Sequence, residues 1–247
     1  MTRQDRISHS FGRASATYNG ASQLQTRAAQ SLAARVLEYA WDQPSALEIG
    51  CGTGGLTRLL LPHLPGNWII SDIAPAMLDA ARAHFPIADA GFRIMDGEAP
   101  DLPAASLDLI VSNLAAQWFE DLPNALERLA GCLASKGRLL ITTLGQASLT
   151  EWRDAVAATG YKAGTPAYPT AQVLSDILPQ AQVGSQTITM THDDARAFLR
   201  SLKAIGATIP AKDYNPLPTA VMRQAMNLLG TPCRVSYEIL TLDWIKP

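Results

Sequence analysis

The chain has 247 residues, with 20 Lys and Arg against 22 Asp and Glu, a formal net charge of −2. This near-neutral composition, without a Lys/Arg run, argues against a nucleic-acid partner, and the scattered Cys51, Cys132 and Cys233 argue against a disulfide framework or a zinc site. The N-terminus is charged and no apolar run approaches the ~20 residues of a membrane span, so we expect a cytoplasmic protein without a membrane partner or a metal.

One α/β domain over residues 1–247 is expected. Residues 1–40 predict one or two helices that could form a lid. Between 45 and 145, short apolar runs alternate with helical patterns, which is typical of βαβ units and a parallel sheet. The predicted strands are Ala46–Ile49, Trp68–Ser71, Phe92–Met95, Leu107–Ser112 and Arg138–Thr143. The predicted helices between them are Leu56–Leu61, Pro75–His84 and Pro123–Leu133. Beyond Gly145 we expect a helix around Trp152, strands Ser185–Met190 and Arg234–Trp244, and a helix between these two strands.

A glycine-rich loop, "ALEIGCGTGGL", follows the first predicted strand and opens a helix. Glycines let the backbone approach a ligand and present its amide groups. Gly50, Gly52 and Gly55 also satisfy the G-x-G-x-x-G spacing of dinucleotide enzymes. Glu48 distinguishes a dinucleotide loop from an S-adenosylmethionine loop. A carboxylate at this position would repel the pyrophosphate of a dinucleotide and favour an ammonium or sulfonium group. The loop therefore favours S-adenosylmethionine over NAD.

Two further acidic residues lie where the second and third predicted strands end. Asp72 can accept hydrogen bonds from ribose hydroxyls of either cofactor. Asp96 can accept from an adenine amino group or support the loop beneath it, but an ordinary Asp-Gly turn explains it equally well.

Glu48 with its glycines, then Asp72, Asp96-Gly97 and "SNLAAQW", form a pattern that resembles the class I S-adenosylmethionine-dependent methyltransferases. The resemblance implies a Rossmann-like α/β fold with a seven-stranded sheet, six strands parallel and the last antiparallel. Residues 45–145 would form the cofactor-binding core, and residues 192–231 an insertion beside the substrate. The implied cofactor contacts are Glu48, Gly50, Gly52, Gly54, Asp72, Ile73, Asp96, Gly97 and Asn113.

We expect a methyl acceptor that needs no strong base, because the residues that usually activate an acceptor are absent. The chain has no N-P-P-Y, no Pro-Cys nucleophile and no His just after the fourth predicted strand. A carboxylate fits, because it is ionised at neutral pH and can attack a methyl sulfonium when held in line.

"FGRASATY", "VSNLAAQW", "TTLGQASLTEW" and "RSLKAIGAT" narrow the resemblance, because together they look like the malonyl-acyl-carrier-protein O-methyltransferases of biotin synthesis. This family methylates the free carboxylate of a malonyl thioester on acyl carrier protein and releases S-adenosylhomocysteine. A related carboxyl methyltransferase acting on a free small acid, of the trans-aconitate type, stays as the alternative. The implied acceptor-side residues are Tyr18, Gln117, Trp118, Arg200 and Lys203.

The acceptor-side residues could also have ordinary structural roles. Arg196, Arg200 and Lys203 lie on one side of an amphipathic helix and could form a solvated face. With the resemblance, Arg200 is favoured as a bidentate ligand of the malonyl carboxylate. Lys203 could bind the same carboxylate, although the helix favours the carrier protein for it. Trp118 and Tyr18 could instead serve as core residue and helix anchor.

Overall fold

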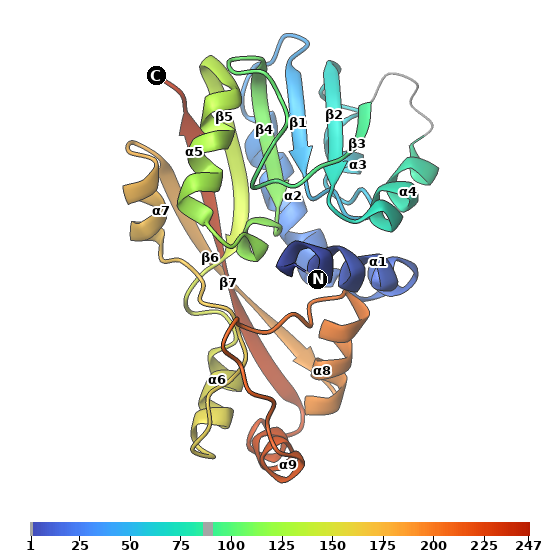
Figure 1. The fold of residues 1–247 in the computed structure, drawn as a ribbon, viewed down its shortest axis with the longest axis vertical. Helices are drawn as coiled ribbons and strands as arrows, with labels where there is room; N and C mark the ends of the chain where they lie inside the picture. Colours follow the sequence, from blue (N-terminus) through green and yellow to red (C-terminus); the bar gives the residue numbers. More distant parts are fainter. Residues whose placement is uncertain (1, 86–90) are drawn as a thin grey trace.

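The computed structural model describes residues 2–85 and 91–247. Its helices and strands alternate through the first half of the chain and form a longer β-pair with added helices in the second (Figure 1). The strands are β1 (Ser45–Ile49), β2 (Asn67–Asp72), β3 (Gly91–Ile94), β4 (Leu107–Asn113), β5 (Leu133–Leu144), β6 (Gln182–His192) and β7 (Cys233–Ile245). The helices are α1 (Arg3–Ala21), α2 (Gln23–Leu37), α3 (Thr57–Leu60), α4 (Pro75–His84), the 3-10 helix η1 (Ala116–Trp118), α5 (Leu122–Cys132), α6 (Thr150–Ala157), α7 (Ala171–Ile177), α8 (Ala195–Ala204) and α9 (Thr219–Leu228).

The described strands form one seven-stranded sheet in the order β3-β2-β1-β4-β5-β7-β6. The pairs from β3 to β5 are parallel, and β7 is antiparallel to both of its neighbours, β5 and β6. Strand β6 therefore runs in the same direction as β1 to β5. The predicted fold, with six strands parallel and the last antiparallel, is confirmed.

Apolar side chains bury both faces of the sheet under helices. On one face, α2, α3 and α4 pack against the central strands, with Leu32, Leu60 and Ile70 buried among them. On the other face, α5 and α7 cover β4, β5 and β7, where Leu126 and Leu174 are buried. The continuous apolar runs of β1 and β4 follow from burial on both faces.

Strands β6 and β7 extend beyond the rest of the sheet. Pairing of β5 with β7 ends at Leu144 and Ile239, whereas β6 and β7 stay paired to His192 and Cys233. This extension supports α6, α8 and α9 below the core, and α1 crosses the carboxyl ends of the parallel strands above α8 (Figure 1). A third apolar cluster, with Phe198 fully buried, holds these helices to the sheet. Two cavities lie beside α1, where the core sheet meets the extension of β6 and β7 with its helices.

Several boundaries differ from those predicted. Strand β5 begins at Leu133, where the predicted helix was expected to end, and its pairing with β4 skips from Leu133 to Arg138. Helix α8 is capped by Asp194, whose carboxylate accepts from the Ala197 amide at 2.7 Å. Helices α7 and α9 were not predicted. No helix of the described residues is long and apolar enough to cross a membrane.

Candidate active site

The glycine loop leaves β1 in a conformation that only glycine adopts easily. Gly50, Gly52 and Gly54 have φ angles of +66°, +55° and +86°. A Cβ on Gly50 would lie 2.4 Å from the Cβ of Ala115, in the segment after β4. The loop thus passes directly against the end of β4 and exposes its backbone at the carboxyl edge of the sheet.

Asp72, the last residue of β2, holds this loop in place. One carboxylate oxygen accepts from the Gly52 amide and the other from the Ala74 amide, both at 2.8 Å. Burial raises the pKa of Asp72 to about 6. Each oxygen has a second lone pair, so the carboxylate can also accept from ligand hydroxyls.

Asp96 and Asn113 also combine a structural role with a place at the site. Asp96 accepts from the Glu98 amide at 3.0 Å, as in an ordinary Asp turn. Asn113 accepts from the Thr142 hydroxyl at 2.9 Å and donates to the Gln25 carbonyl at 3.0 Å. These bonds fix both residues beside the glycine loop.

A small cavity of about 80 Å³ gathers most of the predicted cofactor residues. Its lining includes Gly50, Gly52, Asp72, Ile73, Asp96, Gly97 and Asn113. Sequence reasoning missed its apolar wall, to which Ile7, Met77 and Phe119 contribute. These side chains belong to separate elements, and no local pattern indicates that they meet.

Glu48 and Gly54 are not among the residues that line this cavity. Glu48 is 1% exposed, and its carboxylate accepts from the Thr57 hydroxyl at 2.6 Å in the interior. Burial raises the pKa of Glu48 to about 7. A Cβ on Gly54 would meet the ring of Phe85, on the other side of the loop. The structure thus places the Glu48 side chain against α3, because successive side chains of a strand point to opposite faces.

A larger cavity of about 540 Å³ adjoins the small one and gathers most of the predicted acceptor residues. Tyr18, Gln117, Trp118 and Arg200 line it, whereas Lys203 and Arg196 do not. Tyr18 and Trp118 line both cavities, as do Phe11 and Leu114, so these side chains lie where the two cavities adjoin.

The two aromatic residues at this junction are held by packing. Trp118 meets Phe11 of α1 edge to face, with ring centroids 5.3 Å apart. The Tyr18 ring lies close to Gly52, about 3.7 Å from where a Cβ would be. Burial, with a smaller contribution from Asp72, raises the pKa of Tyr18, so its phenol stays protonated and can donate a hydrogen bond.

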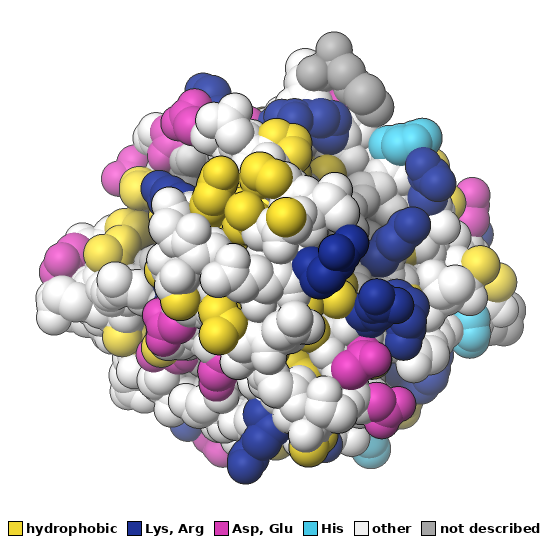
Figure 2. Space-filling view, turned by 90° about the horizontal axis from the view of Figure 1, so that it is seen from below, with side chains coloured by type: hydrophobic (Ala, Val, Ile, Leu, Met, Phe, Trp, Pro, Cys, Tyr) yellow, Lys and Arg dark blue, Asp and Glu magenta, His cyan; other side chains and the backbone are white. Residues whose placement is uncertain are grey.

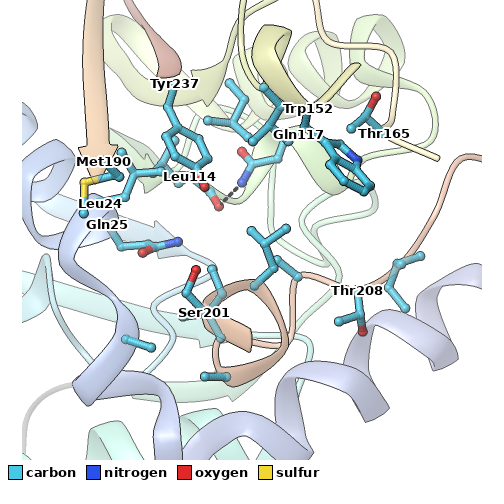
Figure 3. Close-up of a pocket in the computed structure, with 18 of the residues that line it drawn as sticks. Leu24, Gln25, Leu114, Gln117, Trp152, Thr165, Met190, Ser201, Thr208 and Tyr237 are labelled. Atoms are coloured by element: carbon cyan, nitrogen blue, oxygen red, sulfur yellow. Dashed lines mark hydrogen bonds between the residues drawn. The ribbon is translucent and has the colours of Figure 1, made fainter. Parts of the chain in front are cut away.

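The larger cavity has an almost uncharged lining. Among the described residues that line it, Arg200 is the only Lys, Arg, Asp or Glu. Arg200 forms no ion pair with any described residue. Sequence reasoning missed the other polar residues that line this cavity, above all His192 and Gln25. Figure 3 shows the Gln25 side chain at the cavity. No group of three His, Cys, Asp or Glu that could hold a metal occurs within residues 2–85 and 91–247.

Comparison with known proteins agrees with this geometry. Residues 47–141 match the model of a methyltransferase domain. The malonyl-[acyl-carrier protein] O-methyltransferase of Magnetococcus marinus is 35% identical over 231 residues, which cover 91% of this chain and 85% of that protein. The chain belongs to this methyltransferase family. Its methyl donor is S-adenosylmethionine, and the small cavity has the acceptors and glycine backbone to hold a nucleoside.

A second sequence relative and one solved structure are also similar to this chain. The biotin biosynthesis bifunctional protein BioCD of Bordetella avium is 41% identical over 245 residues, or 98% of this chain. The chain spans about half of that protein, since the match covers 52% of it. The crystal structure of the YcgJ protein of Bacillus subtilis superposes with a TM-score of 0.65 at 16% identity, over 88% of this chain and 98% of that one. This last likeness concerns the fold alone.

Proposed function

We propose that the protein transfers a methyl group from S-adenosylmethionine to the free carboxylate of a malonyl thioester on acyl carrier protein, a step of biotin synthesis. When bound, the cofactor supplies an electrophilic methyl group on a sulfonium. The observation that supports this acceptor best is Arg200, a single cation in a large, otherwise uncharged cavity beside the cofactor residues. A thioester with one carboxylate matches such a cavity.

The residues of the chain need to orient the acceptor rather than activate it. A carboxylate is ionised at neutral pH, so no general base is required. Arg200 can hold one carboxylate through two parallel hydrogen bonds. Tyr18 and Trp118 exclude water at the junction and direct the acceptor toward the cofactor. One carboxylate oxygen forms the new C–O bond while the C–S bond breaks, and the sulfonium charge is neutralised.

The same cavity is a poor match for a free di- or tricarboxylate. An acid of the trans-aconitate type has three carboxylates, and Arg200 can pair with one of them. The remaining charges would be buried against apolar side chains such as Leu114, Trp152 and Tyr237, at a large desolvation cost. The malonyl thioester is therefore favoured, because beyond its one carboxylate the arm is uncharged as far as the distant phosphate that joins it to the carrier protein.

The outer side of α8 is proposed to meet the carrier protein. Arg196, Arg200 and Lys203 are all exposed, and of the three only Arg200 also lines the larger cavity. Figure 2 shows Lys and Arg side chains gathered on the side of the molecule where α8 lies. An acidic carrier protein that docks there would bring its thioester arm to the cavity mouth.

Helix α1 is proposed to act as a lid. The small cavity, at about 80 Å³, is well below the roughly 300–1,000 Å³ typical of ligand sites. Gln4, Ile7 and Phe11 of α1 occupy one of its walls. We expect this helix to shift outward when the cofactor enters and to close over it afterwards.

A substrate comparison tests the proposed function. Malonyl carrier protein, malonyl coenzyme A, free malonate and free trans-aconitate are each incubated with S-adenosylmethionine. Mass spectrometry then measures the methyl ester and S-adenosylhomocysteine. We expect the highest kcat/KM on malonyl carrier protein. Absence of its methyl ester, or faster methylation of a free acid, would contradict the proposal.

A further inference from the structure

Helix α1 is hydrogen-bonded to the end of α8. The Thr17 hydroxyl donates to the Ala204 carbonyl at 2.7 Å, and the Ser10 hydroxyl donates to the Gly206 carbonyl at 2.9 Å. Gly206 also packs against the backbone of α1, since a Cβ there would lie 2.9 Å from the Ser10 carbonyl oxygen. The exposed sides of α1 and α8 therefore border each other (Figure 1).

The exposed sides of these two helices carry cations without acidic neighbours in the sequence. Residues 6–21 and 195–211 contain five Lys or Arg and no Asp or Glu. All five are exposed, and we call them the α1–α8 surface: Arg6, Arg13, Arg196, Arg200 and Lys203. None of the five forms an ion pair with another residue of the described chain. The one acid of α1, Asp5, caps the start of that helix. The α1–α8 surface is thus positively charged.

The two arginines of α1 lie beside the residues that bind α8. Arg6 lies four residues before Ser10, and Ser10 bonds to the end of α8. Arg13 lies four residues before Thr17, which bonds there as well. Residues four apart are neighbours on the surface of a helix. Because Lys203 lies in the last turn of α8, cations of both helices flank the contact between them.

A different side of α1 forms a wall of the small cavity. Ile7, Phe11 and Tyr18 line this cavity, whereas Arg6 and Arg13 line neither cavity. A partner that holds the exposed side of α1 would therefore also hold its inner side against the cofactor site. Such a partner would keep the proposed lid closed.

We propose that the carrier protein docks across α1 and α8 together, and that docking holds α1 closed over the cofactor. This inference rests on the proposed function and adds α1 to the docking surface. An acidic carrier protein complements the charge of the α1–α8 surface. A carrier protein that binds the closed position of α1 raises the affinity for the cofactor, and the cofactor raises the affinity for the carrier protein by the same factor.

A double variant, Arg6→Ala with Arg13→Ala, tests the docking surface. Its kcat/KM on malonyl carrier protein should fall about three- to tenfold at low salt, the order of two exposed ion pairs. Added salt should reduce this difference from the wild type, because it screens exposed charges. Malonyl N-acetylcysteamine presents the thioester without a carrier protein, and kcat/KM on it should be unchanged. Arg93→Ala with Lys136→Ala removes the same charge from exposed positions of β3 and β5 and should behave as the wild type.

Calorimetry with S-adenosylhomocysteine tests the link to the lid. The wild-type protein should bind it about three- to tenfold more tightly with saturating malonyl carrier protein than with saturating malonyl N-acetylcysteamine. The double variant on α1 should lose this difference. Its affinity for S-adenosylhomocysteine without an acceptor should equal that of the wild type.

Four results would overturn the inference. Normal kinetics of the α1 variant on malonyl carrier protein would remove α1 from the docking surface. Equal losses on both substrates would point to a merely structural role, and an equal loss in the control pair would point to net charge alone. A wild-type affinity for S-adenosylhomocysteine that ignores the carrier protein would separate docking from the lid. In each case the methyl ester still forms and the proposed function stands. If no malonyl compound is methylated, the proposed function and this inference both fall.

Discussion

The small cavity, proposed to hold the cofactor, and the larger cavity, proposed to hold the acceptor, share the rings of Tyr18 and Trp118 but differ in how they are built. The polar part of the small cavity consists of glycine backbone and short side chains at adjacent strand ends, fixed by hydrogen bonds such as that from Gly52 to Asp72, and apolar side chains close it from the other side. The larger cavity is lined by side chains from helices and loops far apart in the sequence. A cofactor that many enzymes share can be bound largely by backbone groups, whereas specificity for one acceptor depends on individual side chains.

The largest expected effect comes from changing the glycine backbone of the small cavity. Gly50→Ala adds a Cβ at φ +66° and 2.4 Å from Ala115, so the loop has to move. We expect affinity for S-adenosylhomocysteine to fall at least about a hundredfold, or about 3 kcal/mol. Calorimetry measures it, with Gly55→Ala as the control because nothing lies within 4 Å of its Cβ position. Normal binding by Gly50→Ala would show that the loop is not a rigid cradle.

This difference in construction also decides what the sequence could predict. The glycine loop and Asp72 are local features whose geometry follows from one βαβ unit, and the structure confirms that fold. Glu48 shares the same short motif, yet its side chain turns into the interior against Thr57, which the motif alone does not indicate. Gln25 lies in an ordinary polar stretch, and only the tertiary meeting of α2, η1 and β6 makes its oxygen a buried, unpaired acceptor.

Helices α8 and α9 show the same difference between what the sequence predicts and what depends on tertiary packing. Helix α8 is the amphipathic helix expected between the last two strands; it buries Phe198 on its apolar side, and Gly206, with φ +77°, follows its end. Helix α9 begins after Pro218 without a side-chain cap and has Ala225 as its buried residue. Its apolar residues recur at helical spacing, but no start signal marks where it begins, and it forms because the extension of β6 and β7 gives it a surface to pack on.

The next prediction tests a single side chain of the larger cavity, Arg200. Arg200→Ala should lower kcat/KM by about tenfold or more on both malonyl carrier protein and malonyl N-acetylcysteamine, which corresponds to losing about 1.4 kcal/mol of orientation. Affinity for S-adenosylhomocysteine should stay the same. Lys203→Ala, outside the cavity, should affect only the carrier-protein substrate. Arg223→Ala, exposed on α9, is the control. Normal kinetics for Arg200→Ala would return this arginine to an ordinary solvated face.

A pH profile tests Asp72, which lines the small cavity and is proposed to contact the cofactor. Ionised Asp72 accepts from ligand hydroxyls better than its protonated form, and burial raises its pKa to about 6. Affinity for S-adenosylhomocysteine should therefore fall about tenfold as pH drops from 8 to 5, since each unit below the pKa protonates most of the remaining carboxylate. Asp72→Asn should bind more weakly with a flat profile, whereas Asp79→Asn, exposed on α4, should keep the wild-type profile. A flat wild-type profile would argue against a ligand contact of Asp72.

The smallest effect concerns Glu48, which lies beside the glycine loop but faces the interior. Burial raises its pKa from an ordinary 4.5 to about 7, so the folded protein binds this proton more tightly than the unfolded chain. The free energy of unfolding therefore falls as pH rises through this window. Glu48→Gln keeps an acceptor for the Thr57 hydroxyl and removes the buried charge. We expect it to raise the free energy of unfolding at pH 8 by about 1 kcal/mol, and to give no gain at pH 4.5.

Urea unfolding at both pH values measures this change, and Glu127→Gln, exposed on α5, controls for loss of a surface charge. The same variant decides what the carboxylate does for the cofactor. Because Glu48 does not line the cavity, its replacement should weaken S-adenosylhomocysteine binding far less than Gly50→Ala does. A loss as large as that of Gly50→Ala would mean that Glu48 reaches the ligand's amino group after all, as its position in the motif first suggested, and that the interior of this loop rearranges when the cofactor binds.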